Sequence, residues 1–366
     1  MNPASELEGP PRAARPVPLH IPSLDGIRGV SFLIVFLGHA GLRGIVPPYF
    51  GLSVFFFLSG YLITTLMRAE FDRNGDISFR KFYLRRALRI LPTFYLVLFV
   101  AYALSLLGLW GGSEITLTAA LAQVFHLTNY YVIRWGWWYG FPPGTWVYWS
   151  LAVEEHFYLI FPFLYWWLRK RGLSGQQQAH VLLGLCAAVL AWRCVLVFPL
   201  HSIRDRTYVA TDTRIDSILA GCILAVFRNP ALNEGGPSDR VLARVWLPIA
   251  AIALAVSVVV RVQVFEQTLR YTLQSFGLLP FFVAAIRWHD RGLCRLLNHR
   301  VMTYLGLLSY SMYLLHTSTL WALEQWTAWP ELLRTLVAFS ALVVFGTALN
   351  RLVEKPIARL RRRFGG

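Results

Sequence analysis

The chain has 366 residues, of which 56% are hydrophobic and only 15% are charged, so its composition excludes an ordinary soluble domain. A formal charge of +16 would suit a nucleic-acid-binding protein. However, the basic residues stand between long apolar runs rather than on one face of a soluble fold, so no nucleic-acid partner is predicted.

Successive apolar runs of about 20 residues predict an all-α, polytopic membrane protein with about ten transmembrane helices in a lipid bilayer. The apolar stretch 115–133 is interpreted separately, as a re-entrant or interfacial helix. Residues 1–23 are expected to form a disordered cytoplasmic tail, residues 24–355 the membrane domain, and residues 356–366 a basic cytoplasmic tail. The predicted spans are 26–46, 49–67, 88–108, 145–168, 180–198, 212–228, 245–261, 270–288, 302–322 and 332–352.

The lysine and arginine residues fall mostly on one side of this predicted membrane. With the N-terminus inside, 25 of the 35 lie in inside segments and 6 lie in outside loops. Because these residues favour the cytoplasmic side, both termini are predicted to be cytoplasmic. The largest outside loop, 109–144, is rich in tryptophan and tyrosine, which suits a membrane–water interface or a carbohydrate-binding rim.

The first predicted span carries Arg28 and, 11 residues later, His39, which places them about 16 Å apart along a helix. An ionisable side chain deep in a membrane is costly without a partner or a water-filled cavity, so His39 is a candidate functional residue. A neutral imidazole there can act as a general base towards a hydroxyl group. The simpler interpretations are a membrane anchor for Arg28 and a packing hydrogen bond for His39.

Arg86 and Arg89 are three residues apart at the start of the third span, so they share one face of a helix. Arginine suits phosphate because its planar fork binds two oxygens at once. Pro92 follows and can kink the helix, which would aim the pair at a site. The alternative is ordinary inside-loop charge.

Two adjacent carboxylates, Glu154 and Glu155, lie within the fourth span. Buried carboxylates at that depth are difficult to explain by packing alone. At least one of them is therefore expected to pair with a cation or to orient a histidine.

Two later spans carry further polar candidates. Arg214 and Asp216 form either a structural ion pair or support for a site, and Tyr310 and His316 belong to an unusually polar helix. The histidines and glutamates all fall in the middle or outer half of the predicted membrane, whereas the arginines of the first and third spans lie at the inner face. This layout predicts an enzyme that takes an anionic donor from the cytoplasm and an acceptor from the middle or far side. The four cysteines form no C-x-x-C pair, and no metal is expected.

Six motifs in this order resemble the acyltransferase 3 family of integral-membrane acyltransferases. The resemblance covers residues 24–355 and rests on LDGIRGV with His39, FFFLSGYLIT, RRALRILP, WSLAVEEHFYLIFP, TRIDSILAG and LGLLSYSMYLLH. It implies about ten membrane helices in a bacterial inner membrane. It also implies O-acylation of a carbohydrate acceptor such as O-antigen, exopolysaccharide, peptidoglycan or a lipid-linked sugar, usually with acetyl-CoA as cosubstrate.

By position, the resemblance makes His39 the catalytic base and Glu155, together with Glu154, its charged or orienting partner. It makes three arginines the contacts of the acyl-CoA, namely Arg28, Arg86 and Arg89. A covalent acyl intermediate on Ser59 or a tyrosine is the alternative to direct transfer.

Two other functions remain open at this point. A proton-coupled transporter or flippase of a glycan or anionic solute would use the same buried histidine and glutamates as a proton relay. The sequence shows no internal repeat, which counts against such a transporter. The second alternative is acylation of a small-molecule glycoside such as a macrolide. No oligomeric state is predicted.

Overall fold

The computed structural model describes residues 22–42, 44–111, 114–233 and 235–362, and within these ranges it contains helices and turns but no strand. The predicted all-α fold is therefore confirmed, while the predicted tail residues 1–21 and 363–366 lie outside the described residues. The helices are α1 (Pro22–His39), α2 (Pro48–Asn74), α3 (Phe79–Leu106), α4 (Leu117–Val124), α5 (Thr128–Trp135), η1 (Thr145–Tyr148), α6 (Trp149–Lys170), α7 (Gly175–Val197), α8 (Arg204–Val209), α9 (Thr211–Val226), α10 (Asp239–Val241), η2 (Leu242–Trp246), α11 (Leu247–Val259), α12 (Gln263–Gln267), α13 (Leu269–Arg287), α14 (Cys294–Leu297), α15 (Arg300–Trp326), α16 (Glu331–Leu349), η3 (Asn350–Glu354) and α17 (Lys355–Arg362).

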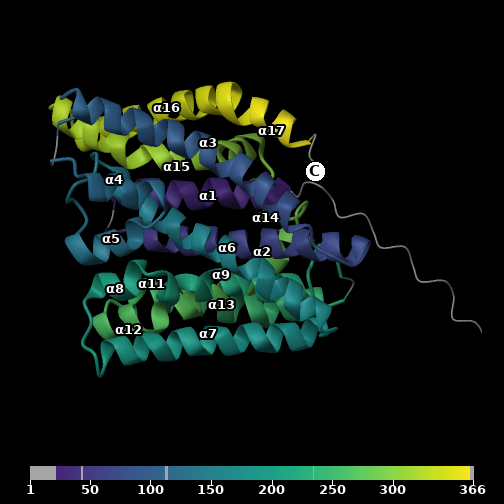
Figure 1. Cartoon of the computed structure of the whole chain (residues 1–366). Helices are drawn as coiled ribbons and strands as arrows, with labels where there is room; N and C mark the ends of the chain where they lie inside the picture. Colours follow the sequence, from purple (N-terminus) through teal and green to yellow (C-terminus); the bar gives the residue numbers. More distant parts are fainter. Residues whose placement is uncertain (1–21, 43, 112–113, 234, 363–366) are drawn as a thin grey trace, which may run out of the picture.

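The long helices lie side by side in one bundle, and each predicted span overlaps one of them (Figure 1). Among the described residues, six segments are long and apolar enough to cross a membrane: α2, α3, α7, Asp239–Val259, α13 and Glu331–Leu360. The other four long helices are α1, α6, α9 and α15. These four carry most of the candidate site residues.

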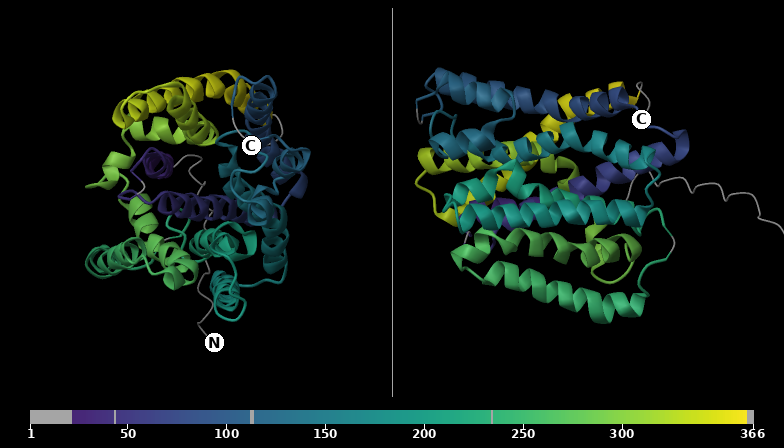
Figure 2. Two further views of the ribbon diagram at one scale, coloured as in Figure 1. Left: turned by 90° about the vertical axis from the view of Figure 1, so that its left-hand side faces the viewer. Right: turned by 60° about the horizontal axis from the view of Figure 1, so that its bottom comes forward.

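One of these four helices, α9, is enclosed by other helices of the bundle. Helix α9 packs against α2, α7 and α13, and nearly all of its side chains are buried. By contrast, only 22% of the most apolar window of α7 is buried inside the protein. Figure 2 shows the bundle end-on and from a second side. A helix screened by its neighbours can carry polar groups that a lipid-facing helix cannot.

The short helices α4, α5, α8 and α12 gather at one end of the bundle (Figure 1). The stretch 115–133 is therefore two helices of 8 residues each, α4 and α5, rather than a single helix. The C-terminal helix α17 lies at the opposite end, near the start of α1, because Asp25 and Lys355 line the same cavity. The predicted basic tail thus begins as an ordered helix.

Helices α2 and α9 approach until their backbones are nearly in contact. Gly60 faces the carbonyl of Ile218, and Gly221 faces the carbonyl of Phe57. A Cβ atom at Gly221 would overlap that carbonyl and lie 2.7 Å from the backbone nitrogen of Tyr61. Small residues of this kind let membrane helices pack closely.

Replacing Gly221 with alanine is expected to destabilise the protein by about 1–3 kcal/mol, because the added methyl group must push α2 away. The matched control is Gly184→Ala on α7, where a Cβ atom meets nothing within 4 Å. Thermal unfolding in detergent measures both variants. Equal melting temperatures for the two variants would contradict the proposed close packing.

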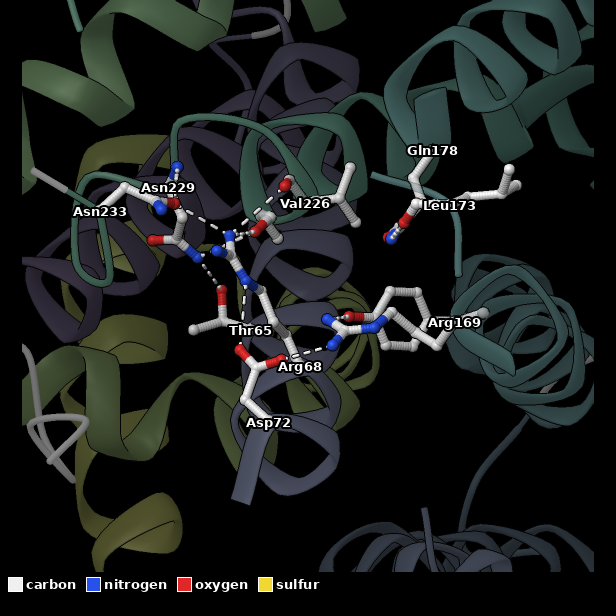
Figure 3. Close-up of polar contacts among 11 residues, drawn as sticks. Thr65, Arg68, Asp72, Arg169, Leu173, Gln178, Val226, Asn229 and Asn233 are labelled. Carbon is white, nitrogen blue, oxygen red and sulfur yellow. Dashed lines mark hydrogen bonds and ion pairs between the residues drawn. The ribbon is translucent and has the colours of Figure 1, made fainter. Parts of the chain in front are cut away.

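A polar network connects α2, α6 and α9 (Figure 3). Arg68 of α2 donates to the carbonyl of Val226 at 3.3 Å and to Asn233 at 2.9 Å, which satisfies the open C-terminus of α9. Asp72 bridges Arg68 at 3.6 Å and Arg169 of α6 at 2.5 Å. These charges join helices to one another, so they explain part of the basic surplus without a ligand.

Candidate active site

A cavity of about 420 Å³ lies among α1, α2, α3, α6, α15 and the C-terminal segment η3–α17. Six of the predicted site residues line it, from five different helices. Its polar lining residues are Asp25, Arg28, Ser59, Arg86, Arg89, Ser150, Glu154, Ser309, Tyr310, Tyr313, Asn350, Glu354 and Lys355.

The cationic groups of the cavity come from three separate parts of the chain. Arg28 of α1 pairs with Asp25 at 2.8 Å. The guanidinium of Arg86 lies over the ring of Tyr158, 3.5 Å from its centroid, and this stacking fixes its direction. Arg89 follows one turn later on α3, and Lys355 enters from α17. The arrangement can hold an anionic group such as a phosphate.

The two glutamates of α6 occupy different places. Glu154 lines the cavity, where its electrostatic partners include Arg86 and its neighbour Ser59 is hydrogen bonded to the hydroxyl of Tyr158. Glu155 is not among the cavity-lining residues, and its buried Oε1 atom has no hydrogen-bond partner within the described part of the chain. The structure thus places both carboxylates beside the arginines.

His39 lies against a second histidine. The Nε2 atom of His316 is 3.3 Å from Nδ1 of His39, and the two ring centroids are 5.1 Å apart. His316 is fully buried, whereas His39 is partly exposed. The sequence predicted both residues as separate candidates, but only the packing of α1 on α15 shows that they form a pair.

The hydrogen bonds of this pair select one tautomer for each neutral ring. Nδ1 of His39 is 2.9 Å from the carbonyl of Val35, and Nδ1 of His316 is 2.6 Å from the carbonyl of Tyr313. A carbonyl oxygen only accepts, so each Nδ1 carries the proton. His316 then accepts from His39 through Nε2, and the basic lone pair of His39 is on its own Nε2 atom. These hydrogen bonds assign one tautomer to each ring.

Tyr313 connects the histidine pair to the cavity. It lines the cavity, its hydroxyl is 2.5 Å from the hydroxyl of Ser150, and its ring centroid is 5.2 Å from that of His316. Tyr313 and His316 are three residues apart on α15, and this spacing was the sequence signal that the two side chains share one face of the helix. Tyr310, which the sequence predicted on this helix, also lines the cavity and donates to the carbonyl of Ile90 at 2.8 Å.

Arg214 and Asp216 do not line this cavity. The two residues also do not form the suggested pair, because Asp216 binds Arg193 of α7 at 2.7 Å and both side chains are fully buried. Arg214 instead stacks on the ring of Tyr271, 3.7 Å from its centroid, and donates to the carbonyl of Tyr208. Successive side chains of a helix point in different directions, so residues two apart face different neighbours.

The sequence interpretation missed Glu354 and Lys355. It ended the last span at residue 352, but the chain continues through the π-helical turn η3 directly into α17. Glu354 accepts hydrogen bonds from Ser311 and, at 2.8 Å, from Asn350, and it faces the cavity. Among the described residues, no three histidine, cysteine, aspartate or glutamate side chains converge as a metal site requires.

Comparison with known proteins identifies the family. Residues 21–351 match the acyltransferase 3 family, described as an acyltransferase domain. The chain belongs to this family. It is 27% identical to the peptidoglycan O-acetyltransferase OatA of Listeria monocytogenes over 93% of this chain and 56% of that protein. It is 29% identical to the O-acetyltransferase OatA of Staphylococcus aureus over 82% of this chain and 50% of that protein.

The acyltransferase 3 chain described here thus spans about half the length of these curated relatives. No solved structure matches it. The resemblance found from six motifs is confirmed at the level of the family, and the apolar helices agree with a multi-pass membrane protein.

Proposed function

We propose that this chain is a membrane O-acetyltransferase that moves an acetyl group from acetyl-CoA to a hydroxyl of a carbohydrate. The observation that carries the proposal is one cavity lined by arginines and a lysine and joined through Tyr313 to the His316–His39 pair. Such a site can hold an anionic donor at one end and deprotonate a hydroxyl at the other. The relatives named as O-acetyltransferases support the same reaction.

The donor would bind with its phosphates beside Arg28, Arg86, Arg89 and Lys355. Coenzyme A carries several phosphate charges at one end of a flexible arm and the thioester at the other. Helix α1 provides the matching separation, because its 11 residues from Arg28 to His39 span about 16 Å. In the proposed topology, ten helices cross the membrane and both termini are cytoplasmic. The donor would then enter the cavity from the cytoplasmic face.

The transfer step follows from the tautomer of His39. Nε2 of His39 removes the proton of the acceptor hydroxyl while the oxygen attacks the thioester carbon. The carbon–sulfur bond breaks, and the leaving thiolate takes the proton from the imidazolium. His316 holds the ring of His39 in place, and Glu154 and Glu155 favour the transient positive charge. Ser59 is the candidate for the competing covalent route.

The proposed acceptor is a carbohydrate of the bacterial cell envelope, and the proposed location is the inner membrane. A relative that is named for peptidoglycan favours a polysaccharide over a macrolide-like small molecule. The family match also favours the transferase over the proton-coupled transporter.

The test uses the purified chain in nanodiscs with acetyl-CoA labelled in its acetyl group and with envelope polysaccharide. We expect ester-linked label in the polysaccharide and release of an equal amount of coenzyme A thiol. Lack of thiol release with any envelope fraction would refute the proposal, and solute uptake into proteoliposomes would then favour transport. Acetylated Ser59 in the protein after mixing with acetyl-CoA would indicate the covalent route.

Replacing Arg86 with alanine is expected to weaken acetyl-CoA binding by roughly tenfold or more, since a charged hydrogen bond to a phosphate contributes about 1.5–3 kcal/mol. The matched control is Arg359→Ala on the exposed side of α17, because Arg359 does not line the cavity. Titration calorimetry with coenzyme A compares the two variants. Unchanged affinity in Arg86→Ala would place the phosphates elsewhere.

A further inference from the structure

The loop between α5 and η1, residues 136–144, has a defined backbone conformation. The φ angles of Gly136, Gly140 and Gly144 are 93°, 75° and 80°, and residues other than glycine rarely adopt such positive values. Gly140 packs against Thr116 of the segment before α4. The glycines therefore fold the sequence WWYGFPP between them into a defined path over this end of the bundle.

The end of this loop is fixed beside the histidine pair. Thr317 donates to the carbonyl of Gly144 at 2.5 Å, and Ser318 donates to the carbonyl of Pro143 at 2.8 Å. These two residues directly follow His316 on α15. These hydrogen bonds thus fix the position of the end of the loop relative to His316.

One tryptophan of η1, which follows the loop, lies next to His39, and a tryptophan of the loop lies next to that one. The ring of Trp146 lies 5.7 Å from that of His39, at an interplanar angle of 67°. Trp138 lies 5.2 Å from Trp146, at 73°, and 67% of its surface is exposed. An open aromatic face is therefore one ring away from the proposed base, at the end of the bundle opposite Lys355.

We propose that Trp138 and Trp146 form the acceptor platform, on which a pyranose ring stacks while one of its hydroxyls reaches Nε2 of His39. This inference rests on the proposed acetyl transfer and adds the place and chemical class of the acceptor. The C–H face of a pyranose is apolar and suits an aromatic ring, while the indole N–H groups can bond to its hydroxyls. The alternative is that these rings only anchor the protein at the membrane–water interface.

Trp135 offers a matched control. It lies on the same side of the bundle at the end of α5, and 49% of its surface is exposed. Its ring stacks on Tyr131 and lies beside Arg134 instead of near His39. An interface anchor would make Trp135 and Trp138 equivalent, whereas an acceptor platform would not.

The experiment measures steady-state acetyl transfer in nanodiscs to chitotetraose, a soluble β-linked oligosaccharide of N-acetylglucosamine. The variants are Trp138→Ala, Trp138→Tyr and Trp135→Ala. Hydrolysis of acetyl-CoA without acceptor is followed in parallel, because it reports the donor site and His39 but not the platform.

We expect Trp138→Ala to raise the KM for the oligosaccharide by roughly tenfold, because the stacking surface is lost. Trp138→Tyr should restore most of the affinity, since a smaller aromatic face remains. Trp135→Ala should leave the KM for the oligosaccharide unchanged. The KM for acetyl-CoA should stay unchanged in all three variants. An equal effect of Trp135→Ala and Trp138→Ala, or a change in melting temperature without a change in KM, would overturn the platform. Failure of the wild type to consume acetyl-CoA would instead refute the proposed function itself.

Discussion

Replacing His39 with alanine is expected to reduce acetyl transfer by about 10²–10⁴-fold, the usual contribution of a general base. The physical reason is that Nδ1 of His39 bonds to the carbonyl of Val35 and to His316, so Nε2 is the atom proposed to take the proton. Coenzyme A binding should be unaffected, because Arg28, one of the proposed phosphate contacts, lies about 16 Å away along α1.

The measurement is the rate of ester formation together with coenzyme A affinity. The control is His180→Ala, which removes an exposed histidine from α7. A second variant, His316→Gln, tests positioning. It should lower kcat more than it changes the KM for acetyl-CoA, because His316 orients the base without touching the donor. Transfer near the wild-type rate in His39→Ala would eliminate His39 as the base.

Replacing Arg193 with methionine is expected to destabilise the protein by about 3–5 kcal/mol, because it leaves the carboxylate of Asp216 buried without its cation. The pair is bidentate, with nitrogen–oxygen distances of 2.7 and 3.2 Å, and both side chains have zero exposure. Thr272 and the carbonyl of Thr213 complete the network. Thermal unfolding and monodispersity in detergent measure the loss.

The double variant Arg193→Met with Asp216→Leu separates two roles for Asp216. Removing both charges should recover much of the stability, because no uncompensated charge remains. If Asp216 serves only the fold, this double variant should also recover acetyl transfer. Recovered stability without recovered acetyl transfer would indicate that Asp216 also contributes to the active site. Arg291→Ala is the control, since its ion pairs with Asp239 and Asp290 are exposed.

The sequence predicted the helices because an apolar run is a local property that needs no knowledge of neighbours. Candidate residues such as Glu154 and His316 were also local signals, since a charge or imidazole within an apolar run is costly. The hydropathy signal is less informative for α9, which is hidden from lipid by α2, α7 and α13.

Pairings between helices were not predictable in the same way. The partner of Asp216 is 23 residues away on α7, and the partner of His39 is 277 residues away on α15. Residues so far apart in the sequence come into contact only when whole helices pack together. That packing depends on details such as the close approach of Gly221 to the carbonyl of Phe57. For the same reason the sequence placed Lys355 near a tail instead of at the cavity.

The division between six apolar helices and four polar ones bears on how the chain enters the bilayer. Helices α1, α6, α9 and α15 carry charged groups that cost free energy when a segment meets lipid alone, whereas α7 or α16 gains free energy from the same transfer. Helix α9 follows α7 along the chain and packs against it, and α1 packs against the following α2. The charged residues of these helices therefore make each of them a poor insertion signal by itself, and the packing against apolar neighbours offsets that cost.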